Sequence, residues 1–292
     1  MHPYNALHPV TLRLDGLTLQ GFSISGLATW LMVPELDVLF DVGECPLAAL
    51  PINHVLLTHA HGDHARCLPR HAQLRRMVGI PTDATYFLPE VIRADCEAWL
   101  KAEARFEGVS EADRILPPLR GLRPDEEPVP LPRRRDLRVR AFPVLHRVPS
   151  LGYTLVATRR KLRPAYAGLP GPEIARLRRE GTEVSTATDD PLLTFIGDCV
   201  ERTLFEQEHI WDSRVLVIEA TFLAPDELPL AERKGHTHLD GVARALEHFG
   251  DRVRCRHIVL KHFSMRYSAD EIRRHVDRVL PSWARPRVEL LL

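Results

Sequence analysis

Three histidines and one aspartate lie within six consecutive positions of the segment THAHGDHA, residues 58–65. Neutral imidazole suits Zn, Fe, Mn, Ni and Cu, and a carboxylate adds a hard oxygen ligand, so this mixture tolerates several transition metals. A lone histidine is usually a surface or core residue, but four ligand-type residues at this spacing are difficult to explain in that way. Zinc is the first expectation, because its catalytic sites use nitrogen and oxygen ligands and leave one position open for water. The segment predicts a hydrolytic metal site formed by His59, His61, Asp63 and His64.

The metal-binding segment begins where a predicted buried strand, residues 54–57 (HVLL), ends. Its tight spacing fits a loop that serves two neighbouring ions, whereas a mononuclear site on one helix would prefer His-x-x-x-His. Distant strand ends converge on one edge of a sheet in α/β folds and build sites there. Three further ligand-type residues also follow short apolar runs, namely His146 after 141–145, Asp198 after 192–196 and His262 after 257–260.

The metal-binding segment and four others resemble the metallo-β-lactamase fold, and within it the ribonuclease Z group, which removes the 3′ trailer from precursor tRNA. The resemblance extends from about Leu39 to Tyr267. It implies an α/β fold of the αββα type, with two packed mixed sheets flanked by helices. Periodicity by itself indicates only a mixed α/β class. The four further segments are LFDVGE at 39–44, VRAFPVLHRVPSLGY at 139–153, TFIGD at 194–198 and KHFSMRY at 261–267.

The resemblance also implies a site for two metal ions. Two zinc ions are the expected cofactors, with manganese or iron as alternatives. Asp198 would bridge the two ions. Carried over by position, the remaining ligands would be His59, His61 and His146 for one ion, and Asp63, His64 and His262 for the other.

Two more segments match the ribonuclease Z group rather than the fold in general. VIEATF at 217–222 resembles its His-Glu-Ala-Thr segment, and KGHT at 234–237 resembles its Gly-His-Ser-Thr segment. Taken singly, Glu219 is explained as a cap at a strand end and His236 as a polar residue at a helix start. Together and in this order they favour a role at the site. The chain departs from the group at Ile218, where a histidine is expected, so any network through that position is altered.

These residue types fit phosphodiester hydrolysis. A bound metal lowers the pKa of water from 15.7 to about 7, and two ions about 3.5–4 Å apart can stabilise the attacking and leaving oxygens. By resemblance, Asp63 would orient or deprotonate the attacking water. His236 would donate a proton to the departing 3′ oxygen, and Glu219 would hold and tune its ring.

Length and composition are compatible with this interpretation. The 292 residues, 45% of them hydrophobic, can bury a sizeable core, and we expect one domain over residues 1–292. The first thirty residues have no secretory pattern, and no window approaches the ~20 apolar residues of a membrane helix, so a cytoplasmic location without membrane contact is expected. Five scattered cysteines without a Cys-x-x-Cys pair indicate reduced thiols rather than a disulfide framework.

The chain alternates strand patterns with helix patterns in both halves. A helical pattern covers 90–107, and a proline-rich, charged stretch over 116–132 is expected to be a loop. Amphipathic helices are expected over 239–249 and 269–280, with Asp270 supporting the start of the second. The expected strands are 11–14, 28–33, 38–41, 54–57, 138–143, 152–158, 192–196, 215–219 and 257–259.

The formal net charge is zero, from 39 basic and 39 acidic residues, which counts mildly against a nucleic-acid enzyme because phosphate binding is largely electrostatic. The distribution is uneven, however, since arginine-rich clusters occupy 133–135, 159–163 and 176–179. A basic stripe in this interval is suited to following an RNA backbone.

Members of the ribonuclease Z group typically extend an arm from this interval to hold the tRNA elbow, and residues 168–177 resemble the far boundary of that arm. Only about fifteen residues separate Tyr153 from this segment, too few for a long helical arm at ~1.5 Å per residue. A short or missing arm is therefore expected. Because one subunit's arm serves the other subunit's site in this group, a homodimer is expected only if tRNA is the substrate.

The main prediction is a ribonuclease Z-like endonuclease acting on structured RNA, namely precursor tRNA. The alternative is a phosphodiesterase of the same fold acting on small or cyclic phosphodiesters, which a missing arm favours. A thioesterase such as a hydroxyacylglutathione hydrolase shares the metal motif but does not explain residues 234–237. A metal-stabilised protein that binds RNA or a partner without turnover is disfavoured, because all seven expected ligands are present.

Overall fold

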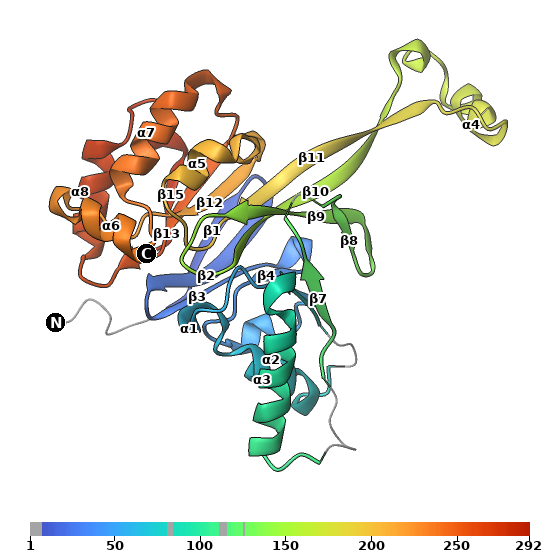
Figure 1. Ribbon diagram of the computed structural model, residues 1–292. Coiled ribbons are helices and arrows are strands. Elements are labelled where there is room, and N and C mark those ends of the chain that lie inside the picture. Colours follow the sequence, from blue (N-terminus) through green and yellow to red (C-terminus); the bar gives the residue numbers. More distant parts are fainter. Residues whose placement is uncertain (1–7, 81–83, 111–115, 125) are drawn as a thin grey trace.

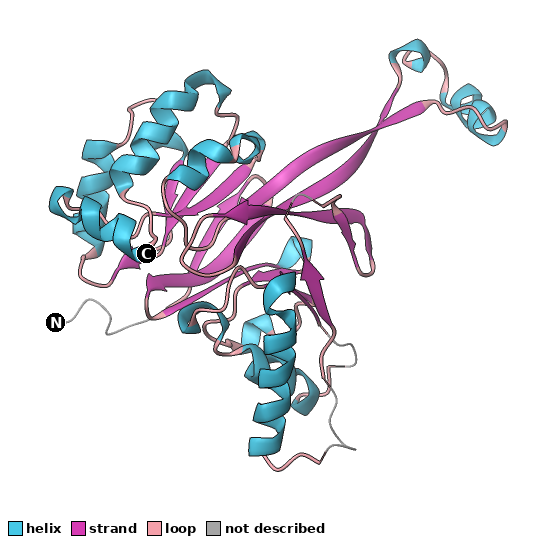
Figure 2. Cartoon of the chain, viewed as in Figure 1, coloured by secondary structure: helices cyan, strands magenta, loops and turns pink. Residues whose placement is uncertain are grey.

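Two β-sheets lie face to face in the body of the protein, and helices cover their outer sides (Figure 1). The computed structural model describes residues 8–80, 84–110, 116–124 and 126–292. Figure 2 shows the strands in the middle of the molecule, with the C-terminal helices on one side and the N-terminal helices on the other. This arrangement confirms the predicted αββα sandwich.

The first sheet comes from the N-terminal half of the chain, with one late addition. Its strands pair in sequence order, antiparallel from β1 to β4 and parallel from β4 to β7. The short β14 (Phe263–Ser264) pairs with the end of β2, which draws the chain after His262 into this sheet. The other strands are β1 (Val10–Leu14), β2 (Leu17–Ser25), β3 (Ala28–Val33), β4 (Val38–Phe40), β5 (His54–Leu56), β6 (Thr85–Pro89) and β7 (Leu119–Leu122).

The second sheet has the order β15-β13-β12-β11-β10-β9-β8. Strands β8 to β11 pair antiparallel, whereas β11, β12, β13 and β15 pair parallel. Parallel strands end on the same side, so loops after β11, β12 and β13 reach one edge. The strands are β8 (Val129–Leu131), β9 (Arg134–Val144), β10 (Ser150–Leu162), β11 (Ser185–Phe195), β12 (Val215–Glu219), β13 (His257–Lys261) and β15 (Val288–Leu290).

Three apolar clusters hold the layers together. One fills the space between the sheets, where the rings of Phe40 and Phe195 stack 4.5 Å apart. A second lies between the first sheet and helices α2 and α3, and a third between the second sheet and helices α5, α7 and α8. The helices are α1 (Gly62–Ala65), α2 (Leu68–Met77), α3 (Arg93–Phe106), α4 (Gly171–Arg179), α5 (Arg202–Glu206), α6 (Leu228–Lys234), α7 (Leu239–Phe249) and α8 (Ala269–Val279).

The two C-terminal helices follow the predicted pattern closely. Helix α7 has the predicted bounds, and its Val242, Leu246 and Phe249 are buried at helical spacing. Helix α8 starts at Ala269 as predicted and ends at Val279, one residue before the predicted end. Its start is fixed by a capping box, in which the side chains of Ser268 and Glu271 each accept from the other's backbone N–H.

The expected loop over residues 116–132 is wrong in part, because β7 and β8 lie inside it. Both strands are at sheet edges, where a proline such as Pro130 in β8 removes no necessary hydrogen bond. The prolines and charged residues of this stretch therefore indicated a loop where the chain forms two edge strands. Strand β2 was also absent from the expected set.

The expectation of a short or missing arm is wrong. Strands β10 and β11 leave the body as a two-stranded ribbon that carries η4 (Pro164–Tyr166) and α4 at its tip (Figure 1). Strand β9 accompanies β10 only to Ala157, whereas β10 and β11 stay paired as far as Leu162 and Ser185. The expectation assumed a helical rise, but a strand residue advances about 3.3 Å, roughly twice as far. A modest number of residues thus suffices for a projecting arm.

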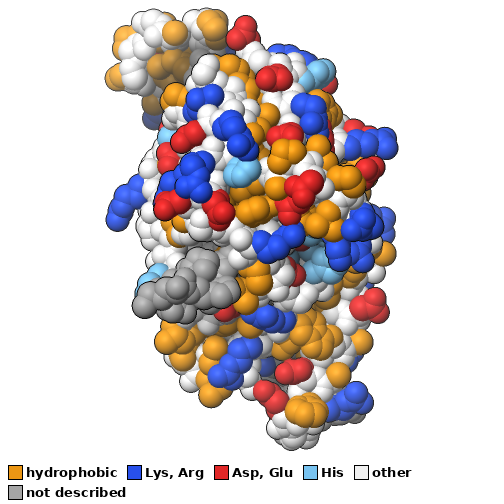
Figure 3. All heavy atoms as spheres, turned by 90° about the vertical axis from the view of Figure 1, so that its left-hand side faces the viewer, with side chains coloured by type: hydrophobic (Ala, Val, Ile, Leu, Met, Phe, Trp, Pro, Cys, Tyr) orange, Lys and Arg blue, Asp and Glu red, His pale blue; other side chains and the backbone are white. Residues whose placement is uncertain are grey.

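No helix in the described part of the chain has both the length and the apolar character needed to cross a membrane. The face that carries the C-terminal helices mixes basic and acidic side chains with apolar ones, without a large area of one sign (Figure 3).

Candidate metal centre

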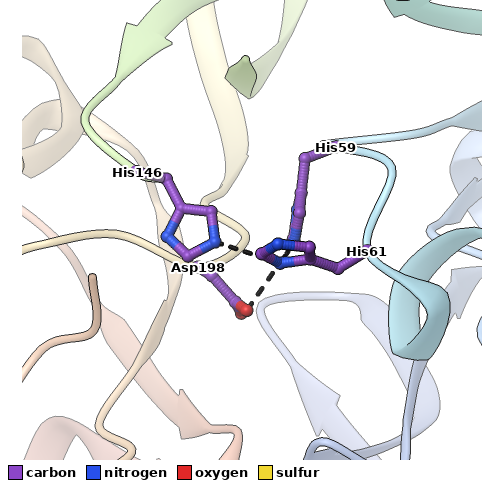
Figure 4. Close-up of side chains that lie close together, drawn as sticks. All are labelled: His59, His61, His146 and Asp198. Atoms are coloured by element: carbon purple, nitrogen blue, oxygen red, sulfur yellow. Dashed lines mark hydrogen bonds and ion pairs between the residues drawn. The ribbon is translucent and has the colours of Figure 1, made fainter. Parts of the chain in front are cut away.

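Seven side chains from both sheets meet at one edge of the sandwich. They form two groups of potential ligand atoms, each group with its atoms within 4.8 Å of one another, and among the described residues a third group of this kind joins His262 to Glu219 and His236. Figure 4 shows the first group, in which three imidazoles and one carboxylate point toward a common space from three loops, one of which carries both His59 and His61. Every residue predicted to be a metal ligand is in one of the two groups. The groups are His59, His61, His146 and Asp198, and Asp63, His64, Asp198 and His262.

The ring nitrogens of the first group face each other at the separation of ligands on one ion. Nδ1 of His61 lies 3.1 Å from Nε2 of His59 and 3.2 Å from Nε2 of His146. Two ligands about 2.1 Å from a tetrahedral ion are ~3.4 Å apart. The geometry fits a divalent cation held by three imidazoles.

The carboxylate of Asp198 joins the two groups. Its Oδ2 lies 3.7 Å from Nε2 of His59, whereas its Oδ1 lies 3.2 Å from Nε2 of His64 and 3.3 Å from Nε2 of His262. Oδ1 is buried and has no hydrogen bond to any described residue. A buried carboxylate oxygen without a hydrogen bond is costly, and a cation at this point would remove that cost. The donor set therefore fits two metal ions that share Asp198.

Asp63 completes the second group. Its Oδ2 lies 3.5 Å from Nε2 of His262 and 3.9 Å from Nε2 of His64, and it accepts a hydrogen bond of 2.8 Å from the backbone N–H of Gly26. The residues after β2 thus hold Asp63 in place. Sequence reasoning assigned no role to Gly26, and its backbone contact leaves no side-chain signal.

Four of the imidazoles are oriented by a hydrogen bond from the nitrogen that faces away from the site. Such partners fix the tautomer and point the free lone pair at the metal. The Nδ1–H groups donate from His59 to Thr58 Oγ1 (3.0 Å), from His64 to Asp41 Oδ2 (2.8 Å), from His146 to the Gly235 carbonyl (2.7 Å) and from His262 to Thr221 Oγ1 (3.0 Å).

Asp41 is an important residue that sequence reasoning did not assign. Besides His64, its carboxylate accepts from the backbone N–H and hydroxyl of Thr58, and it is fully buried. Its signal was available, since an aspartate directly after the apolar strand β4 is unusual in a core. Asp41 and the predicted ligand His262 both have left-handed backbones, with φ of 56° and 63°. Such conformations cost about 1–3 kcal/mol each and cluster at functional sites.

Two glycines allow the ligand loops to approach each other. A Cβ on Gly197 would lie 2.5 Å from Thr58 Oγ1, and one on Gly43 would overlap the carbonyl of Asp63. A larger residue at Gly197 would push apart the loops that carry His59 and Asp198, and one at Gly43 would displace the backbone of Asp63. The strand-to-loop turns therefore require glycine for close backbone contact.

Burial sets the charge of the ligands. It is the main cause that lowers the pKa of His59, His61 and His146, which favours the neutral imidazole that binds metals. At His64, burial opposes the positive charge, but the carboxylates of Asp198 and Asp41 outweigh it and raise the pKa to about 10. A cation at His64 therefore competes with a proton.

Glu219 and His236 form a second unit beside the ligands. Nδ1 of His236 donates to Oε1 of Glu219 over 3.0 Å, and Glu219 is fixed by the backbone N–H groups of Cys199 and Thr221. Burial opposes the charge of His236, but the Glu219 carboxylate raises the pKa of His236 to about 9. The protonated ring lies 3.9 Å from Asp198 Oδ2, so it is placed to give a proton to a group at the centre.

Ile218, where the resemblance implies a histidine, points away from the centre. Successive strand residues face opposite sides, and Ile218 is buried against the C-terminal helices while Glu219 faces the site. The expected alteration of a network at this position therefore concerns the packing behind β12 and not the contacts of Glu219.

Two cavities flank the centre. One, of about 600 Å³, is lined by residues 143–151, which include His146, and by the ends of β6 and β7. The other, of about 760 Å³, is lined by His236, by residues 200–202 with Phe205, and by the start of α6. The side chain of Arg147 and the ring of His146 pack over Gly235, next to His236 in the chain.

Comparison with known proteins identifies the class to which this fold and site belong. Residues 43–263 match the family model described as a beta-lactamase superfamily domain. The chain belongs to that superfamily, and its converging donor groups make it a metal-dependent hydrolase that uses divalent ions.

Within the superfamily the chain belongs to the ribonuclease Z family. It is 31% identical over 268 residues to the chloroplastic tRNase Z TRZ2 of Arabidopsis thaliana, covering 91% of this chain and 72% of that protein. It is 29% identical over 273 residues to tRNase Z TRZ1 of the same plant, covering 92% and 93%. The solved structure of the short form of human tRNase Z has the same fold, with a TM-score of 0.53, 18% identity, and coverage of 98% and 92%.

Proposed function

We propose that this protein is an endoribonuclease with two metal ions that removes the 3′ trailer of precursor tRNA. The observation that carries the proposal is the Glu219–His236 pair beside two donor groups that share Asp198. A dinuclear centre alone would serve several hydrolases of this superfamily. A histidine that a neighbouring carboxylate keeps protonated, next to the metal centre, suits a poor leaving group such as a ribose 3′ oxygen. The names of the relatives, tRNase Z and ribonuclease Z, support the same substrate.

The ligands of the proposed centre are divided between the two ions. His59, His61 and His146 would hold one ion and Asp63, His64 and His262 the other, with Asp198 between them. We propose zinc at both positions, with manganese or iron as alternatives, because imidazole and carboxylate suit all three. When bound, such ions supply an activated water and neutralise charge on the phosphate.

The side chains around the ions have separate tasks in this proposal. Asp63, held by the Gly26 N–H, orients the attacking water and accepts its proton. His236, whose Nδ1 lies 3.9 Å from Asp198 Oδ2, delivers its proton to the departing 3′ oxygen. Glu219 keeps the imidazole of His236 charged and fixed in direction. The reaction leaves a 3′ hydroxyl on the tRNA and a 5′ phosphate on the trailer.

The arm supplies the contact with the body of the tRNA. Residues 158–190 contain seven basic and five acidic side chains, and the exposed Arg160, Lys161, Arg178 and Arg179 have no acidic partner among the described residues. These are free to meet phosphates. We also propose that the protein is a homodimer in which the arm of each subunit serves the site of the other. The proposed location is the cytoplasm.

The alternative of a small or cyclic phosphodiester loses its main support. That alternative depended on a short or missing arm, and the ribbon of β10 and β11 removes this premise. An enzyme for small diesters has no need of a projecting, exposed arm. Arm and proton donor together favour a large RNA substrate with a poor leaving group.

The test is cleavage of a precursor tRNA with a 3′ trailer by zinc- or manganese-loaded protein, beside bis(p-nitrophenyl) phosphate and an Asp63→Ala control. Cleavage directly after the discriminator base, absent in the control, is the expected result. Turnover of the aryl diester alone would exclude precursor tRNA as the substrate while retaining the hydrolytic centre.

A further inference from the structure

The cavity beside His236 has no role in the metal centre itself. Its volume of about 760 Å³ is within the ~300–1,000 Å³ typical of sites for small ligands. It is lined by His236, whereas the cavity of about 600 Å³ is lined by His146, and the two cavities share no lining residue. A strand that passes the centre therefore meets two separate spaces, one beside His146 and one beside His236.

The position of His236 decides which nucleotide occupies this cavity. Nδ1 of His236 is engaged by Glu219, so Nε2 is the atom that can donate to a leaving oxygen. The leaving 3′ oxygen belongs to the nucleotide on the 5′ side of the cut. That nucleotide must lie within hydrogen-bond reach of His236, about 2.6–3.2 Å from oxygen to nitrogen. Its sugar and base then extend into the space that His236 lines.

The walls of the cavity suit a nucleobase. Phe205 is partly buried, and His248 and Phe249 support its ring at centroid distances of 5.4 and 6.3 Å. Leu228 and Pro229 add apolar surface on another wall. An aromatic ring that is fixed from behind is suited to stacking on a base, and it accepts any base because every base has a π face.

The polar part of the cavity is a preformed ion pair. Arg244 donates to both carboxylate oxygens of Glu201, with 2.8 Å between Nε and Oε1, and both residues line the cavity. The pairing holds the planar guanidinium in one orientation while its other edge remains available. A guanidinium and a carboxylate offer donors and acceptors to the edge of a base.

From these contacts we propose that the cavity is a subsite for the nucleoside immediately 5′ of the scissile bond, which stacks on Phe205 and meets the Glu201–Arg244 pair. This inference rests on the proposed function, because it takes the departing group to be a ribose 3′ oxygen. It assigns the cavity a selective role: the enzyme holds the last nucleotide that remains on the tRNA and so sets the position of the cut.

The test removes one base at a time from the substrate and one side chain from the subsite. Precursor tRNAs with an abasic nucleotide directly 5′ or directly 3′ of the cut are compared with the intact RNA in single-turnover experiments. With the unmodified protein, loss of the 5′ base should lower kcat/KM about tenfold, the scale of one base–aromatic stack. Phe205→Ala should lower kcat/KM for the intact RNA about as much, and then be insensitive to loss of the 5′ base but not of the 3′ base.

Two further variants separate the loss of the aromatic face from the loss of apolar volume and from the removal of an unrelated ring. Phe205→Leu keeps apolar volume for folding but lacks the aromatic face, so it should behave like Phe205→Ala. Phe106→Ala removes a 93% exposed ring at the end of α3 and should respond to both abasic RNAs as the unmodified protein does. Melting temperature and metal content of each variant verify that the fold and the centre are intact.

A binding experiment gives a second readout that needs no turnover. In Asp63→Ala protein, a 4-thiouridine placed directly 5′ of the cut should crosslink to peptides that contain residues 200–206 or 228–244. Crosslinks to residues 143–151 instead, or equal abasic penalties with and without Phe205, would overturn the subsite while leaving trailer removal intact. Hydrolysis of the aryl diester with no cleavage of intact precursor tRNA would overturn the proposed function and the subsite with it.

Discussion

The metal centre and the arm hold their side chains in opposite ways. At the centre, His59, His64 and His262 are completely buried, and each is fixed by a hydrogen bond from its outer nitrogen. In the arm, α4 has no buried residue, and the ribbon beyond Ala157 pairs only with itself. The contrast separates two demands: ligands must be held rigidly before the metal binds, whereas contact with a large RNA requires reach and accessible charge.

The base of the arm is where the two regions are connected. Asp190 pairs with Arg159 in the ribbon and with Arg214 before β12, and Arg214 also reaches Asp15 at 3.4 Å. Arg138 on β9 pairs with Asp189 in the same way. These ion pairs fix the direction of the ribbon relative to the body without burying its outer half. Changes at the centre should therefore affect every substrate, and changes in the arm only the large one.

The largest effect is expected from Asp198→Ala, which removes the carboxylate shared by both donor groups. Losing several kcal/mol of charge stabilisation, at 1.36 kcal/mol per tenfold, predicts a decrease of roughly 10³-fold or more in kcat for precursor tRNA and aryl diester alike. Elemental analysis should also find less bound metal. Asp212→Ala, at an exposed ion pair with Arg254, is the matched control and should change neither. Undiminished metal content in Asp198→Ala would contradict the shared-ligand role.

His236→Ala should lower the rate on precursor tRNA much more than the rate on the aryl diester, because the two substrates have different leaving groups. A ribose 3′ oxygen needs a proton as it departs, so trailer removal should fall by about 10²–10⁴-fold. Nitrophenolate departs without one, so hydrolysis of bis(p-nitrophenyl) phosphate should fall much less. Glu219→Gln, which keeps the shape but loses the charge next to His236, should give an intermediate loss on RNA. Equal losses on both substrates would mean that His236 acts on the ions or their ligands and not as a proton donor.

Removal of the arm tip should weaken the binding of precursor tRNA and leave the chemistry at the centre unchanged. Leu162 pairs with Ser185, so an Asn-Gly turn can replace residues 163–184 and close the ribbon as a two-residue hairpin. The arm acts as a second point of attachment, and its loss should raise KM for precursor tRNA roughly 10²-fold. Hydrolysis of the aryl diester should remain unchanged, because the ribbon is remote from the donor groups. A parallel loss on the small substrate would show that the tip supports the fold of the centre.

The difference between the buried centre and the exposed arm also explains which features could be predicted from the sequence. The convergence of several predicted ligands could be anticipated, because His59, His146 and Asp198 each lie shortly after a strand, and strand ends meet at one edge. Their division between two ions came from the family resemblance. Asp41 and Gly26 could not be assigned, since their contacts depend on how two loops approach each other in space. The arm was misjudged because residue counts give length only when strand and helix are distinguished. Exposed segments lack the apolar periodicity that makes this distinction.

The smallest effect, and the most specific for the arm, concerns its unpaired charges. Arg160 and Lys161 are exposed on β10 without an acidic partner among the described residues, whereas Arg163 pairs with Glu183. Replacing the first two by glutamine should weaken precursor tRNA binding only a few-fold at moderate salt and lower the slope of log K against log salt by about 1 per lost phosphate contact. Arg163→Gln is the matched control with a smaller expected change in slope.

Binding is measured with Asp63→Ala protein, so that cleavage does not interfere, over a series of salt concentrations. Because Arg160 and Lys161 lie in the part of the ribbon that pairs only β10 with β11, kcat for bound precursor tRNA should not change when they are replaced. An unchanged salt slope would place the RNA backbone on another surface, such as the basic cluster at residues 133–135. A changed kcat would instead mean that the arm transmits its contacts to the centre, and the separation of the two regions would then be incomplete.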